Sequence, residues 1–95
     1  MDTHHSATLH ISRELPQVYR VLYTVRNVHG GATVPYRLQG HDQLQSSLTD
    51  LGCPPTEIAV ILARVDASMS YVLDLSHMDR PTAQGILNRF AQPLP

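Results

Sequence analysis

Lysine is absent from this 95-residue chain, and all seven of its basic residues are arginines. The absence excludes chemistry that needs a side-chain amine, such as Schiff-base catalysis or phosphate binding by a P-loop lysine. An all-arginine composition is typical of GC-rich bacterial coding, and this bias accounts for it without a functional role.

Cysteine is almost as scarce. Cys53 is the only one, so the chain cannot form an internal disulfide, which fits a reducing compartment. It precedes a proline between two expected helices. A reactive thiol or a soft-metal or haem contact is conceivable there. Because the sequence fixes no base beside it, we expect a half-buried cysteine in a connector.

Long apolar runs and an excess of positive charge are missing as well. The longest apolar run, residues 58–63, is far too short to span a membrane, and the N-terminus has no apolar core of a signal peptide. We therefore expect a cytoplasmic protein without a membrane partner. The net charge of −1 argues against binding by bulk attraction to phosphate.

What remains is the composition of one globular domain. The chain is 42% apolar and 16% charged, which is enough apolar surface for a core, and its length leaves no room for a second domain. We expect a disordered tail over residues 1–6, a single α+β domain over residues 7–92 and a C-terminal tail over residues 93–95.

The strongest pattern is an alternation of apolar residues over residues 17–39. It predicts a β-hairpin in which Gly30-Gly31 forms a two-residue loop. This register pairs Val25 with Tyr36, and it places the apolar residues of both strands on one face. These residues are Tyr19, Val21, Tyr23, Val25, Val34, Tyr36 and Leu38.

Pro35 indicates which strand of the hairpin lies at the sheet edge. In this register it faces Arg26 at a pair without hydrogen bonds, so the missing N–H of Pro35 would point away from the hairpin. We therefore expect residues 33–39 to form an edge strand, with residues 17–28 inside the sheet.

The other elements follow from helical spacing and end signals. Leu44, Leu48 and Leu51 predict a helix from Asp42 that ends at Gly52. A second helix begins near residues 56–57, a strand covers residues 69–76, and a last helix follows Asp79. Residues 7–12 alternate weakly and could form a short first strand.

The fold class is therefore α+β: a small antiparallel or mixed sheet of three to four strands, in the order (β)ββααβα, with helices covering one face. Gly85, in the middle of the last helix, suggests close packing against its backbone.

The outer face of the hairpin carries the first candidate site. Arg20, Leu22, Arg26 and Arg37 lie there, and arginine mixed with apolar residues is a common composition of protein interfaces. An aromatic residue for stacking bases is absent from this face, so nucleic acid is a less favoured partner. A solvated face without a function is the plain alternative.

The second candidate is a rim of His41, Asp42, His77 and Asp79. If strand 69–76 pairs with strand 17–28, then strands 33–39 and 69–76 end at the same rim. Two imidazoles and two carboxylates there could bind a divalent metal or perform acid–base chemistry. The simpler interpretation is that Asp42 and Asp79 cap helices beside solvated histidines, and we expect no metal and no cofactor.

These observations favour a non-catalytic binding or regulatory module that acts through protein–protein contact, with another protein or with a second copy as a homodimer. Two alternatives stay open. One is a protein that contacts nucleic acid through the arginine-bearing face, and the other is a small metal-dependent or acid–base enzyme at the His/Asp rim.

Overall fold

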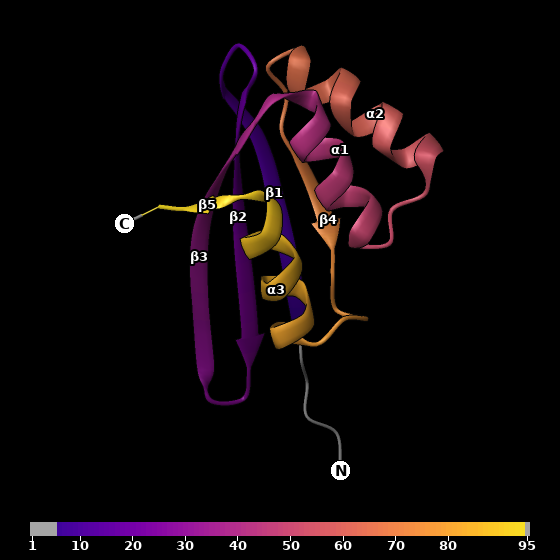
Figure 1. Cartoon of the computed structure of the whole chain (residues 1–95). Coiled ribbons are helices and arrows are strands. Elements are labelled where there is room, and N and C mark those ends of the chain that lie inside the picture. Colours follow the sequence, from indigo (N-terminus) through magenta and orange to yellow (C-terminus); the bar gives the residue numbers. More distant parts are fainter. Residues whose placement is uncertain (1–5, 95) are drawn as a thin grey trace.

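Three ten-residue strands form the centre of the fold in the computed structural model, which describes residues 6–94 (Figure 1). Strands β1 (Ser6–Leu15), β2 (Val18–Asn27) and β3 (Gly30–Gln39) make an antiparallel meander. The short strands β4 (Tyr71–Asp74) and β5 (Gln92–Pro93) extend it, and the sheet order is β4-β1-β2-β3-β5. The α+β class and the predicted order of elements are confirmed.

Three helices cover one face of this sheet (Figure 1). They are α1 (Gly40–Asp50), α2 (Pro55–Asp66) and α3 (Arg80–Phe90). Helix α1 packs between the other two, and α2 lies on the β4 side. The opposite face carries no helix among the described residues, so one layer of side chains there meets solvent.

The core lies between the sheet and the helices, and the predicted alternation fills it. The odd-numbered residues 19–25 of β2 are buried, together with Tyr36 and Leu38 of β3. Leucines of α1 and aliphatic residues of α2 pack against them: Leu44, Leu48, Ile58, Ile61 and Val65. Because strand side chains alternate, the even-numbered residues of β2 face away from the helices.

The register of the β2–β3 hairpin differs from the prediction. The loop is Val28-His29, Asn27 pairs with Gly30, and Tyr36 lies opposite Val21, whereas we had placed it opposite Val25. The predicted Gly30-Gly31 loop is therefore wrong. The loop lies two residues earlier than predicted, which shifts the pairing by four residues; because this shift is even, it preserves which side chains face the core.

The side chain of Asn27 explains where the chain turns. Its Oδ1 accepts a hydrogen bond from the His29 N–H at 2.8 Å, which closes an Asx turn. Gly30 follows with φ +123°, a conformation that other residues rarely adopt. Asparagine at the first position and glycine at the fourth define this turn better than the Gly-Gly pair does.

The strand beside β2 is not the one that the His/Asp rim required. Strand β1 runs ten residues and occupies the position beside β2 that the rim assumed for residues 69–76; β4 pairs with β1 instead. The cause is a tight turn at Pro16-Gln17, where Gln17 has φ +63°. That turn makes β1 and β2 a long hairpin, although the sequence had suggested a break at residues 13–16.

Pro35 does mark an outer strand, though in a different register. It lies opposite Leu22, and its carbonyl accepts a hydrogen bond from the Leu94 N–H at 3.0 Å on the outer side of β3. Its nitrogen therefore also faces outward, so no β2–β3 hydrogen bond is lost. Residues 92–94 run beside β3, so part of the expected C-terminal tail belongs to the sheet. Residues 1–5 and 95 lie outside the described part.

Two of the expected helix ends are confirmed. Gly52 follows α1 with φ +94°, and the Asp79 side chain caps α3 by accepting from the Thr82 N–H. Asp42 does not cap α1, because that helix begins two residues earlier at Gly40. Gly85 is exposed, and a Cβ built there meets nothing within 4 Å, so the expected close packing is wrong.

Candidate functional site

The helix-free face of the sheet gathers the four predicted binding residues. Arg20, Leu22 and Arg26 are alternate residues of β2 that face away from the helices, and Arg37 of β3 lies directly opposite Arg20. The predicted set is therefore one surface, despite the wrong register, because the four-residue shift in pairing is even and kept every side chain on its face.

A row of residues that is apolar except for His10 crosses the middle of this face. Leu22 has Pro35 on one side and His10 of β1 on the other, and His10 is followed by Val72 of β4. Leu22, Pro35 and His10 are half-buried, whereas Val72 at the sheet edge is 57% exposed. The row crosses the four strands β4, β1, β2 and β3, and its apolar atoms lie at the surface.

Arginines lie on either side of this row. Arg37 forms an ion pair with Glu14 at 2.7 Å, whereas no carboxylate of residues 6–94 forms an ion pair with Arg20 or Arg26. Asp74, at the far edge on β4, is the other carboxylate of this face. Hydrogen bonds from Ser76 lower the pKa of Asp74, so it stays charged. The centre of the face is apolar and its surroundings are mainly positive.

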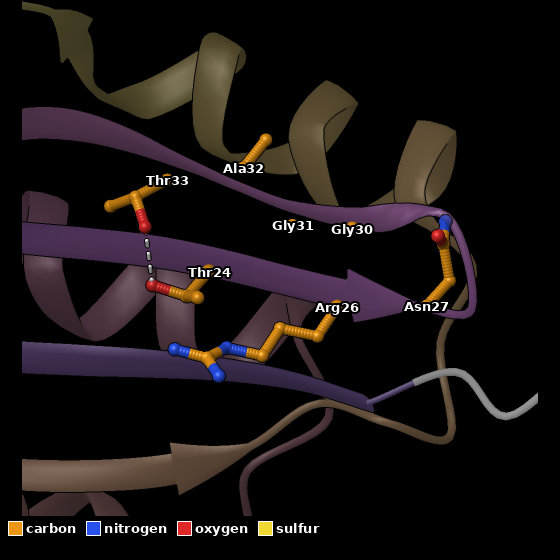
Figure 2. A pocket seen from close by; sticks show the side chains of 7 residues that line it. All are labelled: Thr24, Arg26, Asn27, Gly30, Gly31, Ala32 and Thr33. Carbon is orange, nitrogen blue, oxygen red and sulfur yellow. Dashed lines mark hydrogen bonds between the residues drawn. The ribbon is translucent and has the colours of Figure 1, made fainter.

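A hollow of ≈ 470 Å³ opens on this face at the β2–β3 turn (Figure 2). Gly30 and Gly31, two of its lining residues, contribute no side chain to it. The hydroxyls of Thr24 and Thr33 meet across the strands at 3.0 Å, and Arg26 extends along the face beside them. Because one hydroxyl donates to the other, the hollow offers the Arg26 guanidinium and one remaining hydroxyl donor to a polar group such as a carboxylate.

The second candidate site, the His/Asp rim, is not formed. Strands β3 and β4 run in opposite directions, because two strands rather than one separate them. His41 consequently lies at the start of α1, whereas His77 lies near Gly52 beyond the end of α1. Eleven helical residues separate these points by about 16 Å. No metal-binding group of three or more His, Cys, Asp or Glu side chains occurs within residues 6–94.

His41 instead belongs to a cluster that the sequence did not indicate. Its Nε2 lies 2.8 Å from one carboxylate oxygen of Asp66, and Tyr19 donates its hydroxyl to the other oxygen at 2.8 Å. The Tyr19 and His41 rings stack at 5.8 Å. The cluster joins β2, the start of α1 and the end of α2. No sequence spacing links these positions, so only the fold brings them together.

The pKa values in this cluster follow from the shared carboxylate. Burial and the hydrogen bond to Asp66 raise the pKa of Tyr19 to about 12. The Tyr19 hydroxyl and the His41 imidazole lower the pKa of Asp66. Tyr19 is therefore a phenol that holds a carboxylate in place, which is a structural rather than an acid–base role at neutral pH.

Cys53 is 8% exposed, and desolvation raises its pKa to about 11. A thiol in that state is a poor nucleophile and a poor metal ligand at neutral pH. The helix-free face is accordingly the surface best suited to binding. Sequence comparisons with family models and curated proteins, and a fold comparison with solved structures, found no match.

Proposed function

We propose that this protein is a non-catalytic binding module that docks another protein on the helix-free face of its sheet. The observation that carries the proposal is the row of Leu22, Pro35 and Val72, apolar except for His10, left uncovered between Arg20 and Arg26, which lack ion-pair partners among the described residues. An apolar centre with arginine around it is the composition of interface hot spots.

The dimensions of the face suit a specific interface. Three strands of ten residues are about 33 Å long and together about 14 Å wide, and the four-residue β4 adds a short strip, so the face offers about 500 Å². Two such surfaces in contact would bury about 1,000 Å², in the range of small, transient protein complexes. A transient partner of moderate affinity fits this size.

The charges of the face define the chemistry of the partner. Arg20 and Arg26 favour carboxylates, and the hollow beside Arg26 offers a threonine hydroxyl that can donate to one. The partner should present an apolar centre with acidic residues near it. All four tyrosines face the helix side, so this face has no aromatic platform for nucleic-acid bases. No helix of residues 6–94 is long and apolar enough to cross a membrane.

Photocrosslinking tests the proposal. A benzophenone amino acid replaces Leu22 in one sample and, as the control, Val28 in another; Val28 is 65% exposed at the hairpin turn, outside the face. Illumination in the source cells should give a protein adduct from position 22 alone. An adduct with nucleic acid, or equal adducts from both positions, would contradict the proposal.

Reconstitution with the identified partner completes the test. Calorimetry should show saturable one-to-one binding, weakened about 30-fold by Leu22→Asp and by Arg20→Glu, because truncated or reversed hot-spot residues cost about 2 kcal/mol. Val28→Asp should bind like the native chain. Equal affinity of all four proteins would show that the crosslink reported proximity without an interface.

A further inference from the structure

One edge of the sheet is unpaired, and it is the edge formed by β4. Strand order places β4 last on this side, with β1 as its only neighbour among the described strands (Figure 1). Exposed strand edges are templates for pairing with another chain, and proteins usually blunt them. Strand β4 is only four residues long and carries one charge, Asp74, but it has no proline, and its Val72 is 57% exposed.

The opposite edge of the sheet, on the β3 side, is partly covered. Pro35 interrupts the outer side of β3, and β5 pairs with residues 36–37 of that strand. The chain thus covers part of one edge with its own C-terminal residues and leaves the other open. Pairing through β4 alone would close in a dimer, because the blunted β3 edge offers no continuation of the sheet.

The direction of the free backbone groups on β4 follows from one hydrogen bond. The N–H of Leu75 donates to the carbonyl of Ala7 in β1 at 2.8 Å. Because backbone groups alternate along a strand, Leu73 also faces β1. Val72 and Asp74 therefore direct their N–H and C=O groups to the open edge, where a further strand can bond them.

Helix α2 presents a second unpartnered surface on the same side of the molecule. It contacts β4 and lies at this end of the helix layer. Ile58, Ile61 and Val65 are buried against the sheet, yet its exposed side is also mainly apolar, and Val60 is 51% exposed there. The exposed small and apolar residues are Ala59, Val60 and Ala63 of α2 and Ala67 at its C-cap. A helix that is apolar on both sides is normally covered on both sides.

We propose that a second copy of this chain covers this side, with β4 pairing antiparallel to β4 and α2 packing against α2 across a two-fold axis. The proposal goes beyond the proposed function, because it uses the sheet edge and leaves the helix-free face for another partner. The helix-free faces of the two copies would lie side by side in one continuous sheet.

Charge and side-chain pairing select the register of the two β4 strands. With Val72 opposite its symmetry mate, Asp74 lies opposite Ser70 of the other copy. Moving the axis to Asp74 would place two carboxylates opposite each other, which is unfavourable. The Val72 register also joins the two apolar rows end to end.

Helix α2 is self-complementary in the same arrangement. Glu57 and Arg64 lie two turns apart on the side toward β4: Glu57 accepts from the Tyr71 hydroxyl, and Arg64 lies over the Tyr71 ring. In an antiparallel pair centred near Val60, Glu57 of one copy lies beside Arg64 of the other. Opposite charges therefore meet at both ends of an apolar contact.

Sedimentation equilibrium on the purified native chain tests this proposal. Over about 5 to 500 µM we expect a monomer of 10.6 kDa to convert to a dimer of twice that mass. Val60→Arg should weaken dimerisation at least tenfold, because it places like charges at the axis. Val28→Arg, the same change at another exposed valine, should leave the dimer unchanged. A native chain that stays monomeric at the highest concentration overturns the proposal.

Hydrogen exchange identifies the surface that a dimer uses. The Val72 and Asp74 amides should exchange more slowly at high than at low concentration, because pairing occupies them. A dimer in which both amides stay unprotected would contradict the proposal. A dimer that is disrupted by Leu22→Asp but not by Val60→Arg would also contradict it, because it would form through the helix-free face. Loss of partner binding by Leu22→Asp in an intact dimer would leave both proposals standing separately.

Discussion

At the scale of single residues, Gly85 is the position where a side chain is missing without a structural reason. It lies in the interior of α3 with open space where a Cβ would be. Gly85→Ala should therefore raise the free energy of unfolding by about 0.5–1 kcal/mol, because alanine loses less conformational entropy in a helix. Urea denaturation measures this. A decrease would show that the glycine contacts something outside residues 6–94.

A second prediction at this scale follows from the buried thiol of Cys53. With the pKa raised from 9.0 to about 11, the thiolate fraction at pH 8 falls to about one in a thousand, roughly a hundredfold below that of an unperturbed thiol. Reaction with Ellman's reagent should be slower than that of a free cysteine by at least this factor, and denaturant should abolish the difference. A rate in native buffer equal to that of free cysteine would contradict the buried position.

At the scale of elements, the β2–β3 turn depends on Gly30. Its φ of +123° is unfavourable for any L-residue with a side chain, so Gly30→Ala should lower the free energy of unfolding by about 1–2 kcal/mol. Asn27→Ala should cost about 1 kcal/mol through loss of the Asx hydrogen bond. Thermal unfolding of both variants, with Gly85→Ala as the control of opposite sign, checks the turn. Unchanged stability of Gly30→Ala would favour a loop at other residues.

The β2–β3 turn also shows which features of the fold could be predicted from the sequence. Alternation identified which residues face the core, and that result survived a wrong loop, because strand faces depend only on whether a displacement is odd or even. Alternation contains no information on which strands are neighbours. The long β1–β2 hairpin depends on Gln17 adopting φ +63°, and no residue type at 16–17 demands that turn.

The two candidate sites depended on the strand order to different degrees, so only one of them could be predicted. Arg20, Leu22, Arg26 and Arg37 needed only the alternation within one hairpin, so their common face was predictable. The His41–His77 rim needed the neighbour of β2, which non-local packing determines. The Tyr19–His41–Asp66 cluster, which joins three elements, was beyond sequence reasoning for the same reason.

At the scale of the whole molecule, the titrating groups limit stability at both extremes of pH. The pKa of Asp66 and that of Asp74 are lowered from 3.8, so the stability they contribute is present above about pH 4 and is lost as the pH falls below it. The raised pKa values of Tyr19, Tyr71 and Cys53 act in the opposite range, because they favour the protonated groups in the folded state.

Tyr19 gives this alkaline limit a specific test. Its folded pKa of about 12 exceeds the unfolded value of 10.0, so its contribution is complete below pH 10 and is lost as the pH rises toward 12. The native chain should lose about 1 kcal/mol to this group by pH 11. Tyr19→Phe removes the hydrogen bond to Asp66, so it should be about 1 kcal/mol less stable at pH 8 and yet decline less steeply above pH 10. Urea midpoints measured from pH 8 to pH 11.5 compare the two proteins. Parallel curves would mean that Tyr19 does not control the alkaline limit and that Cys53 and the other tyrosines do.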